Sequence, residues 1–342
     1  MRMSSQEPGP VTVRRYRYFL RPLFRTANVL VTPGMLIDAI MGPQQFNLVH
    51  LHDLRSVQAV CALIRARQSG IPLILQPHGT LKIVLGKERL KHLYDALFGR
   101  NVLNYASRVI VLSEEEATEA RRIGIPERKI VVIPNGVATP SPAEWKTGGS
   151  FRRKFQISED SFLVLFLGRV RASKGVFLLL DAFVNLLERH PDSVLAICGP
   201  DDGAADALRE RARRLGLNVI MPGLVTGADK TAAFVDSNTF CMPSAMETQS
   251  VAILEAASYG LPLVACETSV PTHFVEKGAG LFVDLDPISL ANGLSQVATS
   301  ARLREVLGSR ARAVVDEYYP IEGQTSAVRR LYDAVLREGP EG

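Results

Sequence analysis

Two glutamates, Glu247 and Glu255, are separated by seven residues in METQSVAILEAASYGLPLVA, directly after an apolar run that ends in FCMPS. This pattern predicts a buried strand, a sharp turn and a helix. Because the first backbone N–H groups of a helix have no partner inside it, the helix start near Gln249, Ser250 and Val251 is expected to bind an anion. Glu255 would lie about two helical turns beyond Glu247, so the carboxylates would flank that anion rather than form an acid–base pair.

A second candidate segment, FLVLFLGRVRASKGVFLLLDAF, combines a strand-like run with Gly168, Arg169 and Lys174 before an amphipathic helix. Arginine can bind phosphate oxygens bidentately, lysine acts as a point charge, and a glycine lets a ligand approach the backbone. Solvated cations at a loop–helix junction are the alternative interpretation. The glutamate segment about 75 residues later favours a phosphate site.

Five segments, taken in order, resemble a retaining glycosyltransferase of the large family four, which has the two-domain GT-B fold. They are LQPHGTL around His78, VLSEEEATEARRIGIPERKIVVIPNGV, FLGRVRASKG, ICGPDDG and PSAMETQSVAILEAASYGLPLVAC. The resemblance runs from about Phe46 to the C-terminus, and it is specific as an ordered set.

The resemblance implies transfer of a hexose-type sugar from a nucleoside-diphosphate sugar to an acceptor hydroxyl, with no metal and no separate cofactor. Arg169, Lys174 and the helix start would stabilise the departing diphosphate. Glu247 would hold sugar hydroxyls, and Glu255 would accept hydrogen bonds from the ribose. No covalent nucleophile is evident. By resemblance, attack would come from the front face, and the donor's own phosphate would take the acceptor's proton.

His78 and Gly79 in the PHG segment follow a predicted strand, where open α/β sheets bind ligands. By resemblance His78 would reach the transferred sugar from the first domain, and Gly79 would line the same site. A local hydrogen bond in a turn is the alternative role for His78. His50 and His52 alternate like strand residues, and a metal pair is disfavoured for lack of a third ligand.

The chain departs from the family pattern at two places. The usual E-x-F-G is replaced by Glu247-Thr248-Gln249-Ser250, so Gln249 could bind a sugar substituent and the hexose identity is open. The usual first strand, Gly-rich loop and helix, about 50 to 70 residues, are expected to be missing from an incomplete first domain. A start codon upstream of Met1 is the favoured interpretation. The alternative is a shortened protein whose first domain lacks edge strands and part of the acceptor site.

Alternating apolar runs and helical stretches predict an α/β fold with two Rossmann-like domains that face each other across a cleft. We expect an acceptor-side domain over residues 1–140, a linker over 141–158, a nucleotide-sugar domain over 159–318 and a helix over 319–338 that crosses back to the first domain. Ten short strands are expected, in FNLVHLHD, IPLILQPHG, SRVIVLS, KIVVIPNG, FLVLFLG, SVLAICG, NVIMPG, TFCMPS, LPLVAC and AGLFVD.

Several polar residues have structural interpretations. Asp284 and Asp286 form a D-x-D, but Asp286 before Pro287 is typical of a helix N-cap rather than a metal site. Ser113 with Glu116 three residues later predicts a capping box. Asp201 and Asp202 indicate a turn before a helix. Four scattered cysteines fit reduced core residues better than disulfides or a metal site, namely Cys61, Cys198, Cys241 and Cys266.

The net charge of +5 is uneven, because residues 1–145 hold 19 Lys and Arg against 11 Asp and Glu. Arginines interleave with aromatic residues at Arg14, Arg15, Arg17, Arg21 and Arg25, and further cations follow the PHG turn at Lys82, Lys87, Arg89 and Lys91. Anionic lipid headgroups fit such surfaces, and a solvated basic face is the alternative. No motif supports nucleic-acid binding.

No apolar run approaches the roughly 20 residues that span a bilayer, and no secretory signal is evident. We therefore expect a cytoplasmic enzyme, peripheral at the inner face of the membrane, that acts on a glycan or lipid-linked acceptor. Two rival functions stay open. One is a non-catalytic descendant that binds a nucleotide or a partner, and the other is a GT-B sugar-nucleotide epimerase.

Overall fold

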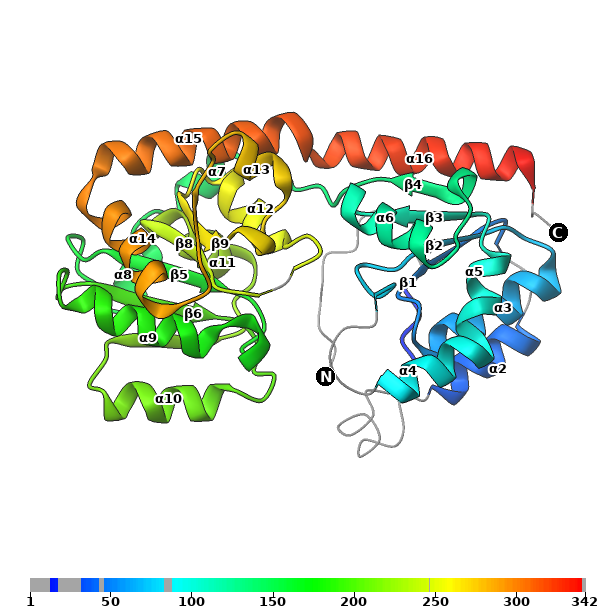
Figure 1. Cartoon of the computed structure of the whole chain (residues 1–342), viewed down its shortest axis with the longest axis horizontal. Coiled ribbons are helices and arrows are strands. Elements are labelled where there is room, and N and C mark those ends of the chain that lie inside the picture. Colours follow the sequence, from blue (N-terminus) through cyan, green and yellow to red (C-terminus); the bar gives the residue numbers. More distant parts are fainter. Residues whose placement is uncertain (1–12, 18–31, 43–45, 83–87, 246, 340–342) are drawn as a thin grey trace. The chain divides into compact units, whose positions relative to one another are not determined.

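The computed structural model describes residues 13–17, 32–42, 46–82, 88–245 and 247–339, and the chain divides into two compact units (Figure 1). Unit 1 comprises Met1–Val132 with Leu331–Gly342, and unit 2 comprises Ile133–Arg330. Each unit is built from strand–helix repeats around a parallel sheet. This confirms the predicted α/β class, and all ten predicted strands are present.

The sheet of unit 1 has the order β1-β2-β3-β4, and every neighbouring pair is parallel. Its strands are β1 Val49–His52, β2 Leu73–Gln76, β3 Arg108–Val111 and β4 Ile130–Val132. The described helical segments around it are α2 Pro33–Met41, α3 Val57–Ser69, α4 Glu88–Tyr94, the π-helical turn η1 Asp95–Gly99, α5 Arg100–Tyr105, α6 Glu114–Arg122 and the 3₁₀ turn η2 Glu127–Lys129. Leu73, Ile74 and Leu75 are fully buried, as expected of a strand covered on both faces.

The sheet of unit 2 has the order β10-β9-β8-β5-β6-β7, again with parallel pairs. Its strands are β5 Leu163–Leu167, β6 Val194–Cys198, β7 Val219–Gly223, β8 Thr239–Met242, β9 Leu263–Cys266 and β10 Leu281–Val283. The chain builds outward from β5 through β6 and β7, then returns to β8 on the other side of β5. A topological switch point therefore lies between β5 and β8, where open α/β sheets bind ligands beyond the carboxyl ends of the strands.

The helices of unit 2 connect these strands and pack over the sheet. They are α7 Pro142–Trp145, α8 Ser150–Lys154, the 3₁₀ turn η3 Ala172–Lys174, α9 Val176–Leu187, α10 Ala205–Arg214, α11 Gly227–Asp236, α12 Val251–Ser258, the 3₁₀ turn η4 Glu267–Ser269, α13 Thr272–Glu276, α14 Pro287–Thr299 and α15 Ala301–Tyr318. Asp286 caps α14 by accepting from the N–H groups of Ile288 and Ser289, each at 2.9 Å, and Pro287 occupies the first turn. The helix-cap interpretation of the D-x-D is thus confirmed.

The segment 141–158, expected to be a linker, is instead a folded part of unit 2. It forms α7 and α8, and the side chain of Phe151 is 2% exposed. Asp236 at the end of α11 accepts hydrogen bonds from the N–H groups of Phe151 and Arg152. A distant carboxylate therefore caps α8, and the division between the units lies at Val132 and Ile133 rather than at residue 140.

The last helix, α16 Ile321–Glu338, begins in unit 2 and ends in unit 1. Next to its start, Val137 and Pro320 form a parallel bridge within unit 2. At its far end the Tyr332 hydroxyl lies 2.6 Å from His50 Nδ1 on β1, and Glu338 forms an ion pair with Arg108 on β3.

Candidate active site

Two predicted motifs meet at the switch point of unit 2. The loop after β5 carries Gly168, Arg169 and Lys174, and the loop after β8 leads to Glu247. Lys174 Nζ lies 2.6 Å from Glu247 Oε1 and 2.7 Å from Oε2. The pair is largely enclosed, because the two side chains are 22% and 10% exposed. The structure thus brings Lys174 and Glu247 into direct contact.

Two glycines, Gly175 and Gly199, allow these loops to approach neighbouring backbone closely. Gly175, with φ of 73°, follows Lys174, and a Cβ there would lie 1.9 Å from the carbonyl oxygen of Pro243. Gly199 after β6 approaches Gly168 so closely that a Cβ would lie 1.8 Å from the Gly168 carbonyl oxygen. The absence of a side chain at Gly199 therefore lets the two loops touch, and the approach of a ligand to Gly168 stays a prediction.

Arg169 pairs with a different carboxylate, that of Asp202. One of its guanidinium nitrogens lies 3.3 Å from Asp202, in the turn after β6, and the side chain is 59% exposed. Asp201 in the same turn accepts hydrogen bonds from three backbone N–H groups, Ala205 foremost, and these hold its pKa below the usual value. The predicted turn is thus present, and Asp202 is the partner of Arg169.

The helix start beyond Glu247 is the N-terminus of α12. Ser250 is its N-cap, with Oγ accepting from Ile253 N–H, and Gln249 Oε1 accepts from Asn135 N–H at 2.6 Å. Both side chains thus have partners within unit 2. The N–H groups of the first turn of a helix have no partner inside it, so Val251 can still offer a backbone donor to an anion.

Glu255 lies on α12 and pairs with Lys230 on α11, whose Nζ lies 2.8 Å from Glu255 Oε1. The sequence analysis missed Lys230. Its spacing from Glu255 matches no motif, and one lysine on a helix carries no signal by itself. Helices α11 and α12 thus hold a second lysine–glutamate pair.

In unit 1 the PHG turn after β2 is tightly held. His78 has φ of 50° and Gly79 has φ of 79°. Gly79 N–H donates to Glu116 Oε1 at 2.6 Å, and Leu112 N–H donates to Oε2 at 2.8 Å. Burial raises the pKa of Glu116, and these hydrogen bonds oppose the rise. Gly79 is therefore engaged with the protein through its N–H.

The expected capping box on α6 is only half formed. Ser113 Oγ accepts from Glu116 N–H at 3.3 Å, as an N-cap does. The Glu116 carboxylate, however, contacts Gly79 and Leu112 instead of returning to the cap, because the turn after β2 offers it a buried N–H donor.

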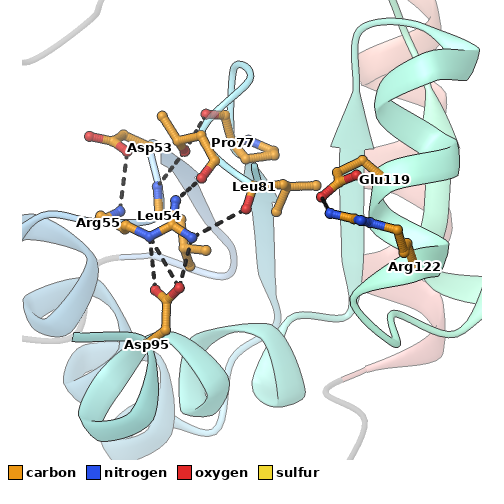
Figure 2. Close-up of polar contacts among 9 residues, drawn as sticks. Asp53, Leu54, Arg55, Pro77, Leu81, Asp95, Glu119 and Arg122 are labelled. Carbon is orange, nitrogen blue, oxygen red and sulfur yellow. Dashed lines mark hydrogen bonds and ion pairs between the residues drawn. The ribbon is translucent and has the colours of Figure 1, made fainter. Parts of the chain in front are cut away.

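Arg55 also holds the turn after β2, through several polar contacts (Figure 2). Its guanidinium makes a bidentate ion pair with Asp95 on η1, with contacts of 2.7 and 2.9 Å. It also donates to the carbonyl oxygens of Thr80 and Leu81. Thr80 Oγ1 donates to the Pro77 carbonyl oxygen at 2.6 Å and so closes the turn. The backbone that carries His78 is thus fixed from several directions.

The three histidines at the ends of β1 and β2 form a cluster. His52 Nδ1 lies 2.8 Å from His78 Nε2, and the His50 and His52 ring centroids are 4.3 Å apart. Burial and neighbouring histidines lower the pKa of His50 to about 4, and burial lowers the pKa of His52 and of His78. Among the described residues, no group of three His, Cys, Asp or Glu side chains is arranged to hold a metal ion.

In the described part of the chain, no helix is long and apolar enough to cross a membrane.

Comparisons with known proteins agree with this geometry. The model of glycosyl transferases group 1 matches residues 149–314, and the model of glycosyltransferase family 4 matches residues 2–140. An uncharacterised glycosyltransferase of Methanocaldococcus jannaschii is 27% identical over 95% of this chain and 85% of its own. A phosphatidyl-myo-inositol mannosyltransferase of Mycobacterium tuberculosis is 32% identical over 61% of this chain and 55% of its own.

Among solved structures, Anabaena HepE in complex with UDP and glucose superposes with a TM-score of 0.75 at 20% identity. The match covers 94% of this chain and 85% of HepE, and it shows a shared fold. The two family models match in order along the chain, and together they cover most of both units. The chain belongs to the GT-B glycosyltransferases.

Proposed function

We propose that this chain is a retaining glycosyltransferase that moves a hexose-type sugar from a nucleoside diphosphate to an acceptor hydroxyl, in the synthesis of a cell-surface glycan or glycolipid. The observation that carries the proposal is the contact of Lys174 with Glu247 at the switch point, since it joins a cation for the diphosphate to a carboxylate for the sugar. The complex of HepE with UDP and glucose supports a nucleotide-sugar donor.

The site must stabilise the leaving diphosphate, because negative charge grows on it as the sugar–phosphate bond breaks. An ammonium group has three N–H donors, and two contacts of Lys174 go to the Glu247 carboxylate, which leaves one donor for a phosphate oxygen. Backbone N–H groups at the start of α12 add positive potential, and Arg169 can exchange Asp202 for phosphate. These groups stabilise the transition state without a metal in the proposed mechanism.

The remaining roles follow from the same arrangement. Glu247 holds sugar hydroxyls from its position beside Lys174. Glu255 accepts hydrogen bonds from the ribose through Oε2, while Lys230 holds Oε1. A role for His78 in binding the sugar stays a prediction from the resemblance.

Product analysis with labelled sugar nucleotides tests the proposal against its two rivals. Transfer gives a new glycoside, and the anomeric proton coupling in its NMR spectrum reports retention. An epimerase gives an isomeric sugar nucleotide and no glycoside, and a binding protein gives neither. The same reaction repeated in excess EDTA should proceed at an unchanged rate, and a strict requirement for added Mg²⁺ or Mn²⁺ would overturn the metal-free mechanism.

We also propose that the acceptor is lipid-linked and that unit 1 meets an anionic membrane. The similar mannosyltransferase is named for a phosphatidylinositol acceptor. On α4 and η1 the side chains of Leu90, Leu93 and Leu97 recur at helical spacing and are 46 to 55% exposed. Basic residues flank this stripe. Apolar side chains bordered by cations favour the interface of an anionic bilayer.

A further inference from the structure

The His78 ring contacts the ring of His52, and this contact is not needed to hold the backbone of the turn. The backbone of the turn is already fixed by Arg55, Thr80 and Glu116. The ring is oriented separately, by the contact of its Nε2 with His52 Nδ1 at 2.8 Å. The two rings stack with centroids 5.1 Å apart at 21°, and both residues are exposed at the carboxyl ends of β1 and β2.

A hydrogen bond between two neutral imidazoles forces a choice of tautomer. One ring must donate and the other must accept, so the protons on the remaining two nitrogens are set as well. If His78 donates from Nε2, both rings carry their proton on Nε2, which is the tautomer that neutral imidazole favours in water. If His52 donates from Nδ1, both rings must adopt the less favoured tautomer. The first arrangement leaves His78 Nδ1 as a hydrogen-bond acceptor.

The surroundings of His52 favour a fixed ring. His50 packs on its other side with centroids 4.3 Å apart, and His50 is itself held by the Tyr332 hydroxyl of α16 at 2.6 Å. All three histidines have lowered pKa values, so the neutral forms persist at pH 7. The neutral His52 ring thus lies between two other imidazole rings.

We propose that His52 is a positioning residue that fixes the tautomer and the orientation of His78, so that His78 Nδ1 accepts a hydrogen bond from a hydroxyl of the transferred sugar. The part that concerns the sugar rests on the proposed function. The part that concerns the tautomer stands on the geometry of the two rings alone. The two parts can therefore be tested separately.

The tautomer is measured by two-dimensional NMR of protein labelled with ¹⁵N in histidine, with the His78 signals assigned by their loss in His78→Gln. The parent protein should show a protonated Nε2 and an unprotonated Nδ1 at His78. In His52→Phe these two shifts should move toward a tautomeric average, and in His52→Asn they should return, because the amide oxygen can accept from Nε2. His92→Phe, which changes a histidine on α4, is the matched control.

Kinetics then test the sugar contact. For His52→Phe we expect kcat/KM for the sugar nucleotide to fall about tenfold, the loss of roughly one hydrogen bond. His52→Asn should recover most of it. The affinity for UDP alone, measured by calorimetry, should be unchanged, because UDP lacks the transferred sugar that His78 is proposed to meet.

Each outcome decides one part. A His78 proton on Nδ1 in the parent protein, or shifts unmoved in His52→Phe, would overturn the assignment of His52. Shifts that behave as expected with no change in kcat/KM would instead refute the contact of His78 with the sugar. If His52→Phe fails to fold, the parent spectrum together with His52→Asn and His52→Gln still answers the question.

Discussion

The ammonium of Lys174 lies within hydrogen-bonding distance of both oxygens of Glu247, and each residue follows a different strand of the switch point. Burial makes such a pair costly to break, since removing one partner leaves the other charge enclosed. A donor that brings a diphosphate beside Lys174 would add a third charged group and share the ammonium. In the proposed mechanism the pair would therefore serve catalysis as well as structure.

We predict that Lys174→Ala lowers kcat about hundredfold and weakens donor binding much less, because the phosphate charge that Lys174 meets grows in the transition state. Steady-state kinetics and calorimetry with the sugar nucleotide measure the two effects. Lys154→Ala is the matched control, since Lys154 forms an exposed pair with Asp229 in the same unit at 2.8 Å. Equal losses in kcat and in donor affinity would show that Lys174 only binds.

The two loops that carry this pair depend on Gly175. A Cβ at this position meets the Pro243 carbonyl oxygen at 1.9 Å in addition to the strain of φ at 73°. Gly216 in the same unit has φ of 63° with nothing within 4 Å of a Cβ, so it separates backbone strain from the clash.

In urea unfolding, Gly216→Ala should cost about 1 to 2 kcal/mol from the left-handed backbone alone. Gly175→Ala should cost about 1 to 3 kcal/mol more, and it should also lower kcat because the loop must shift away from Glu247. Equal free energies for the two variants would mean that the loops have room to separate.

The contact between α16 and β1 should respond to pH through His50. Its pKa is about 4 in the fold and 6.5 when unperturbed, so between these values the unfolded chain binds a proton that the folded chain does not. Stability is therefore lost as the pH falls from about 6.5 toward 4. The groups that face His50 are His52, His78, Gln76 and Tyr332.

After a discount for the partial exposure of the ring, His50 should account for about 1 kcal/mol of the stability lost between pH 7 and pH 5. Unfolding free energies at the two pH values should therefore differ less in His50→Phe than in the parent. An identical difference in both proteins would mean that His50 does not titrate as described.

The strands could be predicted from the sequence, but the side-chain contacts between distant segments could not. Each strand is a short apolar run that ends at a glycine, a proline or a polar residue, so the hydrophobic pattern and the turn residues were enough to predict it. The sequence did not show that residues 141–158 are folded, because the carboxylate that caps α8 belongs to Asp236, about 85 residues away. The pairs Arg55 with Asp95, Lys230 with Glu255 and His52 with His78 likewise join separate segments.

At the scale of the whole molecule, the two units differ in the surfaces that they offer. Unit 1 exposes Leu90, Leu93 and Leu97 beside Arg89 and Arg100 on the continuous run of α4, η1 and α5, of which α4 lies toward the lower edge of unit 1 in Figure 1. Lys87, Arg21 and Arg25, which also contribute to the predicted basic surface, lie outside the described residues. Unit 2 carries its own basic helix, α10, with exposed arginines that have carboxylate partners, as in Arg209 with Asp206 and Arg213 with Glu210.

This contrast supplies a controlled test of membrane attachment. Each cation near an anionic surface contributes about 1 kcal/mol, and the apolar stripe adds burial in the interface, so salt-sensitive peripheral binding is expected. In vesicle co-sedimentation the parent chain should pellet with anionic lipid and remain in solution with neutral lipid. Replacing Arg89, Lys91 and Arg100 together by Gln should abolish pelleting, and so should replacing the three leucines by Ser.

The matched control changes three arginines of α10, namely Arg209, Arg213 and Arg214, to Gln. It removes the same formal charge from unit 2, so a specific surface on unit 1 predicts that this variant still pellets with anionic lipid. If the α10 variant loses binding as fully as the α4 variant, net charge alone governs attachment and the surface on unit 1 has no special role. If the parent pellets with neither lipid, the basic residues of unit 1 are a solvated face and the acceptor should be sought among soluble glycans. If it pellets equally with neutral and anionic lipid, the basic residues are likewise a solvated face and the apolar stripe alone accounts for attachment.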